Sequence, residues 1–254
     1  MIDLQYAKVA FKDYVSSYNE QVGAIKLKIV HTYGVMKITK ELCDKMNINE
    51  EDTNLALLIA LLHDIGRFEQ YKRYESFVDY ETVDHADFAC QLLFEEGLIR
   101  KFIKDESYDD IIYHSIQQHN RYKIEHEYDE RTLFFINMIR DTDKLDNFRV
   151  KETESFETLF KEEKEEVEKS GISDRVYETF MEEKLIYGPD RHTSLDMWIS
   201  YVAFIFDLHF PLSKSYIDEH DYVNISFNRL TPSDNETRKK YEEMRQCALA
   251  YIKR

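Results

Sequence analysis

Residues 57–67 read LLIALLHDIGR and place two metal-ligand side chains directly after an apolar run. The eight apolar residues from Leu55 to Leu62 predict a helix that is buried on most sides. His63 and Asp64 come at the end of this helix, and Gly66 just after them is expected to terminate it. Because neighbouring residues on a helix diverge by about 100°, both side chains can face one ion only where the helix stops. The stretch therefore predicts a central helix that ends in a functional site.

Turn-forming residues are scarce in this chain of 254 residues. It has only 6 Gly and 3 Pro, which argues against many turns and favours long helices. Periodic apolar residues predict helices over residues 21–46, 51–64, 83–97, 108–119, 130–148 and 194–208. The expected fold class is therefore all-α. We expect a single domain over residues 1–254, with a core at about 21–149 and a helical extension, 150–254, that packs on it.

The formal net charge of −16 argues against a broad nucleic-acid-binding surface, because such surfaces need clustered Lys and Arg. A small phosphorylated partner stays compatible with this charge, since a metal ion can supply local positive charge. The segment 151–169 is highly charged, and it predicts a solvated helical face or a mobile lid. The sequence leaves the oligomeric state open, and a homo-oligomer is compatible with it.

Cysteine usage and hydropathy indicate where the protein works. Cys43, Cys90 and Cys247 are widely spaced and form no CxxC pair, which is typical of a reducing cytoplasm. No apolar run approaches the roughly 20 residues that span a bilayer, and the amphipathic start does not read as a signal peptide. We therefore expect a soluble cytoplasmic protein with no membrane partner.

Several ligand-type side chains fall in helices that their apolar neighbours predict to be buried. A buried imidazole or carboxylate needs a partner, and a metal ion can satisfy several of them at once. The set that requires such a partner comprises His31, His63, Asp64 and Asp143. The histidines interpreted as helix caps or core residues are His126, His192, His209 and His220.

Three segments together resemble the HD-domain superfamily of metal-dependent phosphohydrolases, which is named for an H…HD…D signature. They are KIVHTYGVMKITKEL around His31, LLIALLHDIGR, and DTDKLDNFR around Asp143. The resemblance covers roughly residues 25–149 and implies a helical bundle, to which this chain adds C-terminal helices. It also implies that His31, His63, Asp64 and Asp143 bind a divalent metal ion. The second His-Asp pair, His220-Asp221, lacks this sequence context.

Two further segments resemble those in which HD-GYP-type relatives carry ligands for a second ion. VDHADFACQLLFEEG contains His85, and IQQHN contains His119 where those relatives have two adjacent histidines. The resemblance therefore implies one or two ions. If only one ion binds, His85 and His119 are expected to donate hydrogen bonds to the substrate phosphate. Imidazole and carboxylate donors suit Mn, Fe, Ni, Co or Zn, and Mg is possible. The GYP tripeptide itself is absent, which argues against cyclic dinucleotides.

The resemblance also suggests residues for substrate and catalysis. Arg67 replaces the Lys of HDxGK and could bind phosphate bidentately, and Asp64 could orient the attacking water. Further substrate-binding candidates are Lys144, Asn147 and His114. We expect a phosphohydrolase that attacks a small phosphoester or nucleotide with a metal-activated water. The alternatives are an HD-type di-iron oxygenase and a non-catalytic nucleotide-sensing domain.

Overall fold

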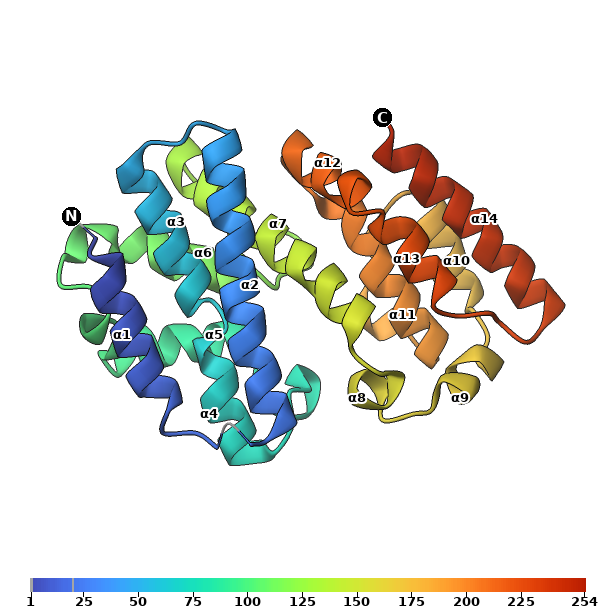
Figure 1. Ribbon diagram of the computed structural model, residues 1–254, viewed down its shortest axis with the longest axis horizontal. Coiled ribbons are helices and arrows are strands. Elements are labelled where there is room, and N and C mark those ends of the chain that lie inside the picture. The colour runs from blue at the N-terminus through green and yellow to red at the C-terminus, as the bar shows by residue number, and fades with distance from the viewer. Residues whose placement is uncertain (1, 20) are drawn as a thin grey trace. The chain divides into compact units, whose positions relative to one another are not determined.

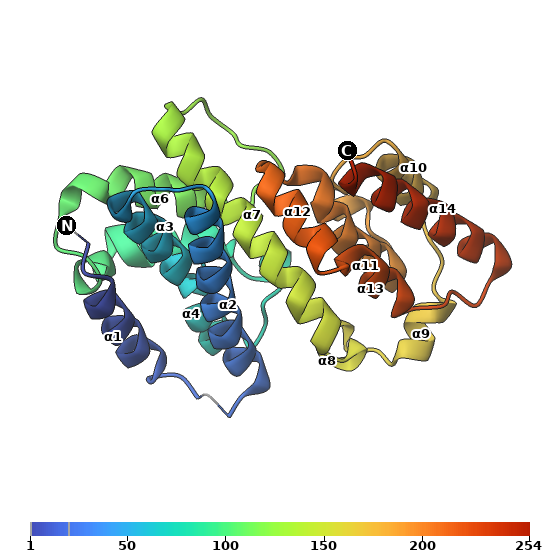
Figure 2. The same cartoon turned by 45° about the horizontal axis from the view of Figure 1, so that its top comes forward.

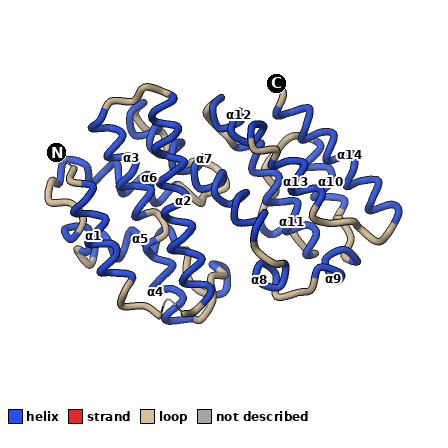
Figure 3. Tube along the Cα trace, in the orientation of Figure 1, coloured by secondary structure: helices blue, strands red, loops and turns tan. Residues whose placement is uncertain are grey.

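The computed structural model describes residues 2–19 and 21–254, and these residues form helices with no β-strand among them (Figures 1 and 3). The all-α fold class is thereby confirmed. The α-helices are α1 (Leu4–Val15), α2 (Gly23–Lys45), α3 (Glu50–Leu62), α4 (Ile65–Tyr74), α5 (His85–Cys90), α6 (Asp109–Gln118), α7 (Glu130–Thr153), α8 (Phe156–Phe160), α9 (Lys164–Lys169), α10 (Asp174–Met181), α11 (Ser194–Val202), α12 (Pro211–Glu219), α13 (Tyr222–Asn228) and α14 (Asn235–Ile252). Short 3-10 segments are η1 (Asp79–Glu81), η3 (Leu98–Lys101), η4 (Glu106–Tyr108), η5 (Gly188–Asp190) and η6 (Ala203–Asp207), and η2 (Gln91–Glu95) is a π-helix.

The chain divides into two compact units, unit 1 (Met1–Asp143) and unit 2 (Lys144–Arg254). The division falls inside α7, close to the limit at residue 149 that the sequence suggested for the core. The expected single domain over residues 1–254 stays a prediction. Among the described residues, no helix is both long and apolar enough to cross a membrane.

Each of the six ranges that the sequence predicted as helical is occupied mostly by helix in the structure, with non-helical residues at some of the ends. The ranges 83–97 and 194–208 each change helix type part-way, into the π-helix η2 and the 3-10 segment η6. The sequence patterns did not single out α1, α4, α10, α12, α13 or α14. Of these, α4 and α14 are rich in polar residues, so little apolar periodicity marks them.

Helix α3 lies at the centre of unit 1. Its residues from Leu55 to Leu62 are all buried, and α1, α2 and α6 pack against it. Figures 1 and 2 both show α2 beside α3. At the start of α3, Asn49 Oδ1 accepts a hydrogen bond from the Asp52 amide, and three acidic residues in the first turn complement the helix dipole. The apolar run therefore anchors this helix in the core, as predicted.

The chain changes direction at His63 and Asp64, between α3 and α4. His63 keeps helical backbone angles, whereas Asp64 leaves the helix with φ −102° and ψ 15°. Gly66 lies inside α4, so the prediction that it terminates the preceding helix is wrong. A Cβ atom on Gly66 would lie 2.6 Å from the carbonyl oxygen of His85 and 2.8 Å from the amide nitrogen of Ala89. Glycine is needed here because the backbones of α4 and α5 approach closely.

Unit 2 is built around α11 and α14. Trp198 of α11 is almost fully buried, and α14 packs against α10, α12 and α13. The charged segment 151–169 forms the end of α7 followed by α8 and α9. Phe156 and Val167 are buried in it, while most of its charged side chains are exposed. This arrangement agrees with the interpretation of the segment as a solvated helical face.

Candidate metal centre

Unit 1 brings six ligand-type side chains together from five helical segments. The first cluster, as named here, consists of His31 (α2), His63 and Asp64 (the α3–α4 junction) and Asp143 (α7). The second cluster consists of Asp64, His85 (α5) and His119 (the end of α6). All four histidines and Asp64 are buried. The helices thus direct their polar residues into the interior of the unit.

The first cluster is spaced as the ligands of one ion would be. Asp64 Oδ2 lies 3.7 Å from His31 Nε2 and 3.6 Å from His63 Nε2. Asp143 Oδ1 lies 2.9 Å from His31 Nε2 and 3.8 Å from His63 Nε2. When metal–ligand bonds are about 2.1 Å, neighbouring ligand atoms are about 3.0 Å apart in an octahedron and about 3.4 Å in a tetrahedron. The separations are therefore close to those of a coordination shell.

The second cluster uses the other oxygen of Asp64. Asp64 Oδ1 lies 3.5 Å from His85 Nε2, and His85 Nε2 lies 3.0 Å from His119 Nε2. The carboxylate of Asp64 thus presents Oδ2 to the first cluster and Oδ1 to the second. A carboxylate in this orientation could bind two ions at once.

Three of the histidines have their tautomer fixed by an acceptor that cannot donate. The pairs are His63 Nδ1 with Ala60 O at 2.8 Å, His119 Nδ1 with Ile116 O at 2.6 Å, and His85 Nδ1 with Asp79 Oδ2 at 2.6 Å. Each ring therefore carries its hydrogen on Nδ1 and a lone pair on Nε2. His63 Nε2 is buried with no hydrogen-bond partner among the described residues. These lone pairs need a hydrogen-bond donor or a cation, and the donor set fits a metal ion.

Burial favours the neutral form of two of the imidazoles, His63 and His119. It lowers the pKa of His63, and it lowers the pKa of His119 to about 3. Neither ring therefore takes up a second proton near pH 7. Because metal binding requires the neutral imidazole, the environment of both rings favours an ion.

Neighbouring basic side chains keep the carboxylates ionised. Burial on its own would raise the pKa of Asp64, but Lys28, the histidines and Arg67 hold that pKa well below its usual range. The pKa of Asp143 is also below its usual range, because the hydrogen bond and charge of His31 outweigh burial. Both carboxylates are therefore in the state that binds metal ions.

Comparison with protein families agrees with this arrangement. The family model for the HD domain matches residues 29–148 of the chain. Residues 29–148 are an HD domain. The match contains both clusters and confirms the resemblance seen in the sequence. HD domains form a family of metal-dependent hydrolases. Comparisons with curated proteins and with solved structures gave no significant match.

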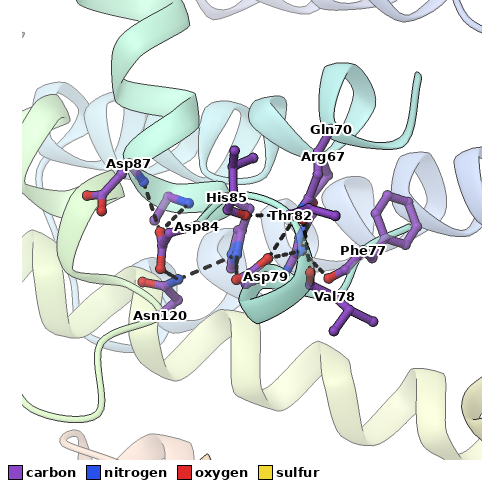
Figure 4. Close-up of polar contacts among 12 residues, drawn as sticks. Arg67, Gln70, Phe77, Val78, Asp79, Thr82, Asp84, His85, Asp87 and Asn120 are labelled. Carbon is purple, nitrogen blue, oxygen red and sulfur yellow. Dashed lines mark hydrogen bonds and ion pairs between the residues drawn. The ribbon is translucent and has the colours of Figure 1, made fainter. Parts of the chain in front are cut away.

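Arg67 of the HD domain is bound by residues of α4 and of the segment that follows it. Its Nη1 donates to Asp79 Oδ1, to Gln70 Oε1 and to the carbonyl oxygen of Phe77 (Figure 4). Its Nε lies 3.7 Å from Asp64 Oδ1. Its Nη2 has no hydrogen-bond partner among the described residues. The predicted contact between Arg67 and phosphate stays a prediction, and the structure adds a contact with Asp79.

The other predicted substrate residues do not belong to either cluster. His114 contacts the rings of Tyr113 and Tyr128 in unit 1. Lys144, in unit 2, forms an ion pair with Asp207 Oδ2 at 3.0 Å. Asn147 lines a small cavity of unit 2 together with Lys151, Trp198 and other residues. Their roles toward a substrate stay predictions.

Sequence reasoning missed two residues that contact the clusters. Lys28 Nζ lies 2.6 Å from Asp64 Oδ2. Its spacing of three from His31 puts both on one helix face, which is a signal that could have been used. Asp79 contacts His85 from the three-residue segment η1, which is too short for apolar periodicity to indicate it. Only the folded chain brings Asp79 to the HD domain's second cluster.

Proposed function

We propose that the protein is a metal-dependent phosphohydrolase that uses two divalent ions to cleave a small phosphoester or a nucleotide. The observation that carries this proposal is the position of Asp64, whose two carboxylate oxygens face two different histidine pairs. Two ions held side by side suit in-line displacement at phosphorus, since they stabilise both the attacking and the leaving oxygen.

The donor atoms divide between the two ions. His31, His63 and Asp143 would hold one ion, His85 and His119 would hold the other, and Asp64 would bind both. Imidazole with carboxylate suits Mn, Fe, Co, Ni or Zn, and Mg is less suited because it prefers oxygen ligands. When bound, such ions lower the pKa of a water molecule and neutralise charge on phosphoryl oxygens.

Two side chains of the protein contribute positive charge beside the clusters. Lys28 lies against Asp64 Oδ2, and Arg67 Nε lies on the side of Asp64 Oδ1. The unpartnered Nη2 of Arg67 is suited to a phosphate oxygen, since guanidinium groups bind phosphate through directed hydrogen bonds. These two cations bind and orient a phosphate in a chain whose net charge is −16. The partner is therefore a small anionic molecule.

The test is hydrolysis by protein that has been stripped of metal and reloaded. Phosphate release from p-nitrophenyl phosphate, bis(p-nitrophenyl) phosphate and nucleoside mono- and triphosphates is measured with Mn, Fe, Co, Ni, Zn or Mg. We expect release that depends on added metal and is equally fast without dioxygen. The same six donors fit a di-iron oxygenase, for which turnover would require dioxygen. Substrate binding without any turnover by metal-loaded protein would contradict the proposal and favour a sensing domain.

A further inference from the structure

Two polar groups approach the same nitrogen of His85 from different elements. Asp79 Oδ2 lies 2.6 Å from His85 Nδ1, and the amide nitrogen of Asn120 lies 3.4 Å from it (Figure 4). The carboxylate can only accept a hydrogen bond, whereas the amide nitrogen can only donate one. The two neighbours therefore favour opposite tautomers of His85.

The tautomer decides whether His85 can bind an ion in the second cluster. With the hydrogen on Nδ1, the lone pair is on Nε2, which faces Asp64 and His119. With the hydrogen on Nε2, that position is blocked and an N–H bond points at the other ligands. The contact with Asp79 is shorter and involves a charge, so it outweighs the contact with Asn120.

Asp79 is held in a fixed orientation by α4. Its Oδ1 accepts hydrogen bonds from Arg67 Nη1 at 2.6 Å and from Gln70 Nε2 at 3.0 Å, which leaves Oδ2 for His85. Gln70 is fully buried, and its amide also donates to Thr82 Oγ1 and to the carbonyl oxygen of Val83. The segment η1, which carries Asp79, is therefore tied to α4, the helix that follows Asp64.

We propose that Asp79 is the positioning residue that selects the metal-binding tautomer of His85 and so controls the affinity of the second cluster for an ion. The inference about the ion rests on the proposed function, whereas the inference about the tautomer holds for metal-free protein as well. Residues that orient a ligand in this way typically contribute about 10–100-fold to metal affinity.

The decisive variant is Asp79→Asn. Arg67 and Gln70 both donate to the Oδ1 position, so the new side chain keeps its oxygen there and turns its NH₂ group toward His85. His85 then receives a hydrogen on Nδ1 from two donors and must carry its own on Nε2. Asp79→Ala, which leaves Asn120 as the remaining neighbour of Nδ1, is a second variant with the same expected tautomer. Glu81→Gln is the matched control, because it makes the same charge change at an exposed position of η1.

Two readouts separate this inference from the proposed function. In metal-free protein, ¹⁵N NMR of the histidine rings, assigned with His85→Gln, reports the tautomer directly. We expect Nδ1–H in wild type and Glu81→Gln, and Nε2–H in both Asp79 variants. Calorimetric titration with Mn should give two ions in wild type, with the second bound about 10–100-fold more weakly in the Asp79 variants.

The outcomes have distinct meanings. If wild type binds a single ion, the two-ion function fails, and the NMR result alone decides the role of Asp79. If wild type binds two ions, an unchanged tautomer or an unchanged second affinity in the Asp79 variants overturns the inference. Loss of both ions in Asp79→Asn, with Glu81→Gln unaffected, would also overturn it, since the effect would then be structural.

Discussion

Lys28 Nζ lies 2.6 Å from Asp64 Oδ2, the carboxylate oxygen that faces His31 and His63. The ammonium group therefore lies beside the first cluster. In metal-free protein it balances the negative charge of Asp64. An ion in the first cluster would compete with this contact for Asp64 Oδ2, and the released ammonium would then be close to any phosphate bound there. Lys28 is thus expected to oppose metal binding and to assist phosphate binding.

Lys28→Met should change the two affinities in opposite directions. Removing an ion pair of about 1 kcal/mol should strengthen Mn binding about fivefold, because the ion no longer displaces a cation. Binding of inorganic phosphate to the metal-loaded protein should weaken at the same time. Calorimetry measures both affinities, and Lys26→Met, at an exposed position of the same helix, should change neither. Weaker binding of both Mn and phosphate would show that Lys28 mainly supports the fold.

Asp64→Asn should remove both ions. The amide keeps the shape of the side chain but loses its charge, and its nitrogen cannot act as a ligand. We expect metal affinity to fall by more than about 100-fold, since loss of a ligand should exceed the roughly 10–100-fold effect of residues behind the ligands. Metal content after gel filtration measures this. The control is Asp221→Asn in the other His-Asp pair, where φ is 53° and asparagine is readily accommodated. Equal metal retention in the two variants would refute the assignment.

Gly66→Ala should destabilise unit 1. The added methyl group would lie within 3 Å of backbone atoms of His85 and Ala89, which cannot rotate away. Forcing the helices apart should cost about 1–3 kcal/mol in the free energy of unfolding and weaken the second cluster. Urea denaturation measures this cost. Gly23→Ala, which meets no heavy atom within 4 Å, should have no destabilising effect. Equal stability of the two variants would be inconsistent with the close approach of α4 and α5.

The thiols should depend on pH in a defined direction. Burial raises the pKa of Cys43 to about 11 and that of Cys90 to about 12. Both thiols therefore stay protonated and unreactive at pH 8 in the folded protein. Their contribution to stability is full below the unfolded pKa of about 8.5 and is lost as pH rises toward the folded values. Ellman's reagent should react slowly with both in native protein and rapidly in guanidinium, and three fast thiols in native protein would contradict this.

The sequence predicted the parts of the site that regular helices carry. The apolar run before His63 indicated a buried helix, and the spacing of apolar residues around His31 indicated another. Both helices exist, and their polar residues meet because buried imidazoles and carboxylates need partners. The folded chain also brings together His85 and His119, which the sequence pointed out in separate segments.

The remaining features depend on distances that no local pattern encodes. Gly66 was interpreted as a helix terminator because glycine often has that role, whereas its neighbours across space, His85 and Ala89, explain it. Asp79 lies in the short segment η1, and its contact with His85 follows from the way Gln70 fixes that segment. Such contacts arise from tertiary structure, so apolar periodicity could not reveal them.

Asp143 is the last residue of unit 1, and this position affects how the site forms during biosynthesis. It follows Asp64 by 79 positions (143 − 64) and His119 by 24 (143 − 119). At about 5–20 residues per second, roughly 4–16 s separate the synthesis of Asp64 from that of Asp143. The ribosome has therefore synthesised every residue of the second cluster while the first cluster still lacks Asp143. In the growing chain, the second cluster is complete before the first.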